Sequence, residues 1–114
     1  MHSRELLKGT IEIIILKLLQ ENKRMYGYEM MQEADKISGG RITISEGSMY
    51  TILHQLVKEG LVQTNEEANG NGKRIRIYYA LTKEGKKTAR DKLKEMQAFI
   101  TSLQVVFVNP KLAT

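Results

Sequence analysis

The sequence predicts a mainly helical fold that carries one small β-hairpin and ends in a single long helix. Apolar residues recur at helical spacing in four segments, and two Asn-Gly pairs at residues 69–72 mark one hairpin turn. Near the C-terminus the apolar residues follow a coiled-coil repeat. The 114 residues support one domain, and 41% apolar content is ordinary for a folded protein.

The first helix is expected over residues 5–20 and is apolar on two faces. One face is predicted to lie in the core and comprises Leu7, Ile11, Ile14, Ile15 and Leu18. Leu6, Ile13 and Leu16 lie on roughly the opposite side. Because one small domain cannot bury both faces, the second face predicts contact with another copy of the chain.

Two more helices should follow. One restarts near Tyr26 after the polar break at 22–25 and stops at residues 38–40, because glycine readily adopts the left-handed conformation that ends helices. A short extended piece at 41–44 leads to Ser45, a suitable N-cap for a helix over about 46–59 that ends at Gly60. In this third helix Met49, Ile52, Leu53 and Leu56 should face inward, while the outer face shows Gly47, Tyr50, Thr51, His54 and Lys58.

A hairpin is expected from strands at 61–65 and 74–81, joined by a loop at 66–72. The return strand alternates, with Ile75, Ile77, Tyr79 and Leu81 on one face and Arg74, Arg76 and Tyr78 on the other. Two strands alone are unstable in water, so this hairpin should pack on the helices.

The last helix should begin after the N-cap Thr82 and run over residues 83–108, roughly 39 Å at 1.5 Å per residue. Its seam is Ala89, Leu93, Met96, Ile100, Leu103 and Phe107. Steps of four and three are typical of a coiled coil, and the helix is too long for this domain to cover, so it should pair with another helix. Pro110 cannot continue it.

Charge favours a polyanionic partner. The chain has 18 Lys and Arg against 13 Asp and Glu, a net charge of +5, and many of the cations fall between Lys73 and Lys94. The alternative is that the charge serves only solubility. With no cysteine, disulfides and thiolate chemistry are excluded. The first residues do not resemble a signal peptide and the longest apolar run is short, so a cytoplasmic protein is expected.

A helix with a polar outer face followed by a basic hairpin is the layout of a winged helix-turn-helix. The chain also resembles the PadR family of bacterial transcriptional regulators from about Leu7 to Leu103. The matching motifs, in order, are Gly27-Tyr28-Glu29-Met30, Ser48-Met49-Tyr50 with Leu53 and Leu56, Gly60-Leu61-Val62, and Tyr78-Tyr79-Ala80-Leu81-Thr82 with Gly85. Met49 and Thr51 depart from the leucine and proline common in the family.

The single C-terminal helix is similar to that of the short PadR subfamily, whose members dimerise through the first and last helices. The resemblance implies a DNA-binding unit at 1–82 and a dimerisation helix with tail at 83–114, packed as one compact unit. The dimer-interface residues expected are Leu6, Ile13, Leu16, Ala89, Leu93, Met96, Ile100, Leu103 and Phe107.

The third helix is expected to enter the major groove and the wing to contact phosphates or the minor groove. The expected DNA-binding residues are Ser48, Tyr50, Thr51, His54, Gln55, Lys58, Lys73, Arg74 and Arg76. Tyr50 could be partly structural and pack on the second helix. Each surface also has an ordinary interpretation, as a solvated helix face or as an edge strand guarded by charge.

The two histidines, His2 and His54, lie on different elements without acidic residues at metal-ligand spacing, so we expect no metal and no cofactor. No catalytic constellation is apparent, so we expect no enzyme. Short PadR-like proteins can hold flat apolar or phenolic effectors between the first and last helices. Here that space would be lined by Ile13, Leu16, Met96, Phe99 and Ile100. A closely packed interface without a ligand is the alternative.

Together these expectations predict a homodimeric transcription factor that binds a pseudo-palindromic operator. The resemblance implies a repressor, because repression is common in the family. The competing hypothesis is a winged-helix module that grips a protein partner with the same surfaces.

Overall fold

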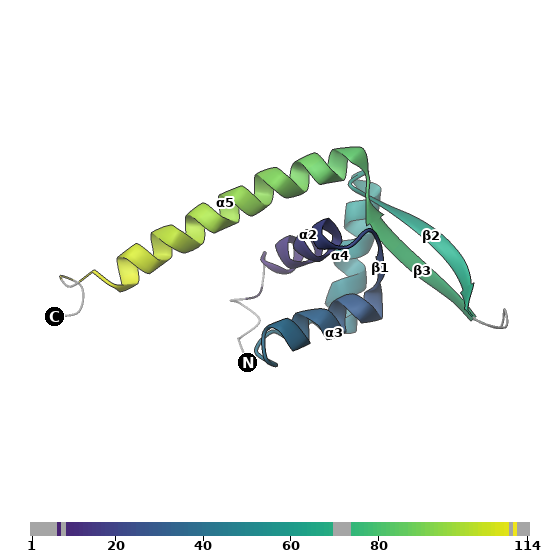
Figure 1. The fold of residues 1–114 in the computed structure, drawn as a ribbon, viewed down its shortest axis with the longest axis horizontal. Coiled ribbons are helices and arrows are strands. Elements are labelled where there is room, and N and C mark those ends of the chain that lie inside the picture. Colours follow the sequence, from purple (N-terminus) through teal and green to yellow (C-terminus); the bar gives the residue numbers. More distant parts are fainter. Residues whose placement is uncertain (1–6, 8, 70–73, 110, 112–114) are drawn as a thin grey trace.

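The computed structural model describes residues 7, 9–69, 74–109 and 111 (Figure 1). The shorter helices gather at one end, a twisted hairpin flanks them, and the long C-terminal helix runs away from the group. The elements are α2 Ile11–Glu21, β1 Met25–Tyr26, α3 Gly27–Ile37, α4 Glu46–Lys58, β2 Val62–Asn69, β3 Arg74–Leu81 and α5 Lys83–Phe107. The predicted winged helix-turn-helix with one long C-terminal helix is confirmed.

The first helix differs from the continuous 5–20 helix that was predicted. Gly9 has a φ of +85°, and both the amide and the hydroxyl of Thr10 donate to the carbonyl oxygen of Leu7, at 2.9 and 2.7 Å. The chain therefore turns at Gly9, and α2 starts at Ile11. Residues 1–6 and 8, including Leu6 and His2, lie outside the described residues.

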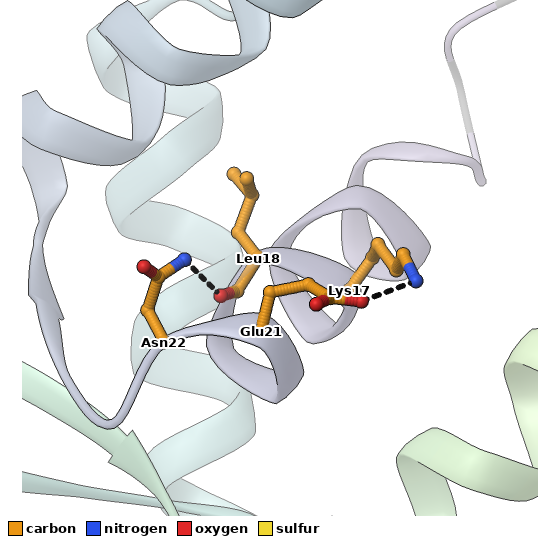
Figure 2. A network of polar contacts seen from close by, with 4 residues as sticks. All are labelled: Lys17, Leu18, Glu21 and Asn22. Atoms are coloured by element: carbon orange, nitrogen blue, oxygen red, sulfur yellow. Dashed lines mark hydrogen bonds and ion pairs between the residues drawn. The ribbon is translucent and has the colours of Figure 1, made fainter.

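The C-terminal end of α2 is capped by Asn22, the first residue after the helix. Figure 2 shows Asn22 turning back so that its Nδ2 donates to the carbonyl oxygen of Leu18, at 2.8 Å. The backbone N–H of Asn22 donates to the same oxygen at 3.1 Å. Lys17 forms an exposed ion pair with Glu21 on the last turn of the helix. Carbonyls at the end of a helix need such partners, so Asn22 fixes where α2 stops.

The predicted N-caps of the two later helices are confirmed. The amide of Ser48 donates to the Ser45 hydroxyl at 3.2 Å at the start of α4. The amide of Gly85 donates to the Thr82 hydroxyl at 2.9 Å at the start of α5. Each cap satisfies an amide that has no partner within its helix.

Among the described residues the sheet has three strands in the order β1-β3-β2, all antiparallel. Sequence reasoning missed β1, because Met25 and Tyr26 are too few to show alternation. Met25 is buried opposite Tyr79. The extended piece expected at 41–44 does not join this sheet. Strand β2 continues to Asn69, beyond the predicted end at 65, and the Asn-Gly turn at 70–72 lies outside the described residues.

The core lies where α2, α3, α4 and the base of the sheet meet. Its fully buried large side chains are Ile15, Leu16, Met30, Met49, Leu53 and Leu56. The inward face predicted for α4 is confirmed for Met49, Leu53 and Leu56, while Ile52 is only partly buried.

Two residues predicted for the dimer interface belong to this core instead. Leu16 and Ala89 are 0% exposed within the single chain. Helix α2 contacts α3, α4, β3 and α5, so the chain itself covers most of the helix surface. Neither side chain is available to a partner, and the prediction is wrong for both. Ile13 keeps partial exposure on α2.

Helix α5 begins against the core and then leaves it, which gives the molecule its extents of 63 × 29 × 20 Å (Figure 1). Gly85 and Ala89 are buried, whereas Phe99 and Phe107 are 56% and 80% exposed. None of the helices in the described part of the chain is long and apolar enough to cross a membrane.

The start of α5 is locked to the end of α4. The Thr82 hydroxyl donates to the carbonyl oxygen of Gly60 at 2.7 Å, and the Thr82 amide donates to that of Leu61 at 3.0 Å. A Cβ added to Gly85 would stand 1.8 Å from the Leu61 oxygen. We call this contact between Gly60–Leu61 and Thr82–Gly85 the α4–α5 junction.

The variant Gly85→Ala is therefore expected to lose about 2–3 kcal/mol in free energy of unfolding, because backbone must move to admit the methyl group. Chemical denaturation followed by circular dichroism measures the loss. The matched control is Gly47→Ala, also in a helix, where nothing lies within 4 Å of the added Cβ. It should change stability by less than about 1 kcal/mol. Equal stability of the two variants would contradict the close approach.

Candidate nucleic-acid interface

The outer face of α4 is polar and open. Thr51, His54, Gln55 and Lys58 are exposed, and Ser48 is half-buried. The face is fixed because the opposite side of the same helix is anchored in the core. An amphipathic helix held in this way presents a constant set of hydroxyl, imidazole, amide and ammonium groups, which suits hydrogen bonding to base edges and phosphates.

Tyr50 lies at the border between this face and the fold. It is half-buried, and a Cβ added to Gly27 would come within 2.6 Å of its Oη. The ring therefore packs on the first residue of α3, as the partly structural interpretation expected. Burial raises the pKa of the neighbouring Tyr79, and Tyr50 contributes in the same direction.

A hollow of about 630 Å³ opens beside the first turn of α4. The hydroxyl-bearing residues Thr43, Ser45, Ser48 and Thr51 line it together with the apolar residues Leu7, Ile11 and Ile52. Backbone amides at a helix N-terminus and nearby hydroxyls are groups that bind phosphate oxygens. The hollow therefore places phosphate-binding groups next to an apolar wall at the N-terminal end of α4.

The wing carries exposed cations on β3. Arg74 and Arg76 are exposed, and Lys73 lies outside the described residues. Ile75 and Ile77 are also exposed, at 66% and 42%, although the same strand face buries Tyr79 and Leu81 farther along. The hairpin reaches beyond the helices that cover its base, so only that base packs (Figure 1).

On the opposite face of the sheet, Arg24, Tyr26, Arg76 and Tyr78 form a stack, which we call the outer-face stack. The Arg24 guanidinium lies 4.0 Å from the centre of the Tyr78 ring, and that of Arg76 lies 4.5 Å from the centre of Tyr26. The two rings meet edge to face, with centres 5.6 Å apart. Sequence reasoning missed Arg24 and Tyr26 because it placed no strand there.

Glu67 on β2 forms an ion pair with Arg24 at the end of the stack. The hydrogen bond from Arg24 lowers the pKa of the Glu67 carboxyl, and the same bond raises the pKa of Arg24. Both side chains are more than 40% exposed. The pair therefore adds little to stability, but it neutralises the charge of Arg24, which lies just before β1.

The residues predicted for the dimer seam on the outer part of α5 are exposed in the single chain. Ile100, Leu103 and Phe107 are 45%, 39% and 80% exposed. Met96 and Leu93 are half-buried, Leu93 against the core. From Phe99 onward the large apolar side chains of α5 are exposed. Figure 1 shows that this part of the helix has left the core.

Three of the five residues predicted to hold an effector meet at one place. Ile13, Met96 and Phe99 line a hollow of about 260 Å³ between α2 and α5. An ion pair of 2.6 Å between Glu12 and Lys92 stands on its wall. Leu16 is in the core, so that part of the prediction is wrong, and Ile100 is not among the lining residues.

His54 is exposed on the outer face of α4. Within the described residues no group of three or more His, Asp or Glu side chains could hold a metal ion. The exposed side chains of α4 and β3 offer hydrogen-bonding groups and positive charge.

Comparison with known proteins identifies a family of transcriptional regulators. The sequence profile of the "Transcriptional regulator PadR-like family" matches residues 15–91, which include α3, α4, the wing and the start of α5. A protein of Lysinibacillus sphaericus named "Uncharacterized protein X" is 30% identical over 92 residues, covering 80% of this chain and 82% of the relative.

Solved structures agree along almost the whole length. A transcriptional regulator from Clostridium thermocellum is 27% identical with a TM-score of 0.80, covering 96% of this chain and 100% of its own. A PadR-like transcriptional regulator from Bacillus cereus is also 27% identical, with a TM-score of 0.77 and coverage of 92% and 98%. The chain belongs to the PadR-like family of transcriptional regulators.

Proposed function

We propose that this regulator binds a pseudo-palindromic operator as a homodimer and represses transcription. The observation that carries the proposal is the exposed polar face of α4, anchored through Met49, Leu53 and Leu56 and flanked by a basic wing. A rigid helix with an open polar face beside a slender cationic hairpin matches the groove and backbone of duplex DNA. Such a protein works where the chromosome lies, which in bacteria is the cytoplasm.

The two surfaces have different roles in this proposal. Helix α4 enters the major groove, where His54 and Gln55 read base edges and Ser48, Thr51 and Lys58 contact the backbone. Tyr50 contributes from the border of the face. The wing residues Arg74 and Arg76, with Lys73, neutralise flanking phosphates and supply affinity on every sequence.

The dimer forms through the part of α5 that leaves the core. Phe99, Leu103 and Phe107 are large, apolar and exposed in the single chain, and monomeric proteins rarely expose so continuous an apolar stripe. A second α5 covers the stripe and places the two α4 helices about one helical turn of DNA apart, roughly 34 Å.

The hollow lined by Ile13, Met96 and Phe99 is the proposed effector site. A small apolar or phenolic compound that prefers one arrangement of the two subunits changes the spacing of the α4 helices and so the affinity for the operator. The Glu12–Lys92 ion pair and Glu95 offer polar atoms beside the apolar part of the wall.

Selection of bound duplexes from a random pool tests the function directly. We expect an enriched site with two-fold symmetry and half-sites about 10 base pairs apart, since two identical helices read it. Affinity for the selected site should fall steeply with added salt, because phosphates are neutralised. No enrichment, together with salt-independent capture of a protein partner, would favour the protein-interaction alternative, for which exposed Ile75 and Ile77 provide an apolar surface.

The variant Leu103→Asp should be monomeric at micromolar concentration, because a charge buried without a partner costs several kcal/mol. Analytical ultracentrifugation reports the mass. The control Ser102→Asp adds the same charge to the neighbouring residue, which points away from the seam of apolar residues. It should remain dimeric. A monomeric wild type, or dimeric Leu103→Asp, would contradict dimerisation through α5.

A further inference from the structure

The outer-face stack is assembled by strand register. Tyr26 on β1 pairs with Tyr78 on β3, and Glu67 on β2 pairs with Arg76 on β3. Successive side chains of a strand point to opposite faces, and Met25 and Tyr79 occupy the core face. The sheet therefore holds Tyr26, Tyr78, Arg76 and Glu67 together on the face turned away from the core.

The two arginines of the stack are in different states. Arg24 lies on Tyr78 and is also paired with the Glu67 carboxylate. Arg76 lies on Tyr26, and within the described residues it has no carboxylate partner. A guanidinium held over a ring face can still donate two N–H groups to two oxygens of one phosphate.

We propose that Tyr26 is a positioning residue that orients Arg76 toward a DNA phosphate. In the same proposal, the ion pair with Glu67 prevents Arg24 from contacting the DNA backbone. This inference rests on the proposed function and extends it to residues outside α4 and β3. Free arginine side chains lose considerable rotamer freedom when they bind, and a ring that restricts Arg76 beforehand reduces that loss.

The first experiment measures duplex affinity and its salt dependence by fluorescence anisotropy, on the selected site and on an unrelated duplex. The variant Tyr26→Leu should weaken binding about threefold on both duplexes, the size of an exposed cation–π contact. Tyr26→Phe keeps the ring and should restore affinity to within about twofold of wild type. Arg76→Ala should weaken binding further and reduce the salt slope by about one ion.

A double-mutant cycle separates positioning from a general structural effect. In the Arg76→Ala background, Tyr26→Leu should cause no further loss, because the group that it positions is gone. A full additional loss in that background, or a Tyr26→Leu protein that binds like wild type, would overturn the positioning role. Thermal unfolding of each variant checks the fold, and Tyr26→Gln serves as a second ring-free variant if Tyr26→Leu does not fold.

The second experiment tests the withheld arginine with a matched pair of charge changes. Glu67→Gln and the control Glu66→Gln each remove one negative charge from β2, but only Glu67 is paired with Arg24. Glu67→Gln should strengthen binding to both duplexes about twofold more than Glu66→Gln and raise the salt slope, because a second arginine becomes available. The surplus should vanish in the Arg24→Gln background. Equal gains from the two glutamine variants would overturn this half of the inference.

Failure of the inference is distinguishable from failure of the proposed function. If wild type binds no duplex at low salt, the function itself is wrong. A second outcome would leave DNA binding intact: wild type binds and Arg76→Ala weakens binding, but every Tyr26 variant binds like wild type and Glu67→Gln gains no more affinity than Glu66→Gln. In that case only the role of the outer-face stack is wrong.

Discussion

The structure depends on the α4–α5 junction. After α4 the chain passes Gly60, forms the wing, and returns at Thr82 to the end of α4. Three contacts hold it there: two hydrogen bonds donated by Thr82 and the close approach of Gly85 to the Leu61 carbonyl oxygen. Since Gly60 has a φ of +77° and Gly85 has no room for a Cβ, both ends of the hairpin require glycine. One small contact therefore fixes the directions of α4, the wing and α5 relative to one another.

This constraint explains why surfaces far apart in the sequence can act together. The core buries one side of α4 and leaves its polar face open, and the junction aims the wing beside it. The same junction sends α5 outward, where its apolar stripe leaves the core and remains exposed. In the proposed dimer, any change in how two α5 helices meet is transmitted to the positions of the α4 helices, because the α4–α5 junction ties the start of α5 to the end of α4. A chain with a loose connection at residues 82–85 would bind DNA without coupling to its dimer interface.

Sequence patterns predicted the fold class, the caps Ser45 and Thr82 and the inward face of α4, since each depends on local chemistry or on helical period. They failed where tertiary contacts decide. Leu16 and Ile13 are equally apolar, and only the position of α2 between α4 and α5 buries the first and leaves the second partly open. The two-residue strand β1 has too little sequence to show a period, so the outer-face stack that it completes was not foreseen. The break at Gly9 was also missed, because a glycine in an apolar pattern is compatible with a continuous helix.

The most direct test of the junction is native-state hydrogen exchange of the Thr82 amide, measured by NMR and compared with the buried amides of Leu53 and Leu56. If α4, the wing and α5 form one unit, this amide should exchange only through global unfolding, with the same opening free energy as the two core amides. Exchange through a smaller local opening, as at a frayed helix end, would contradict the account, because α5 could then move independently of α4.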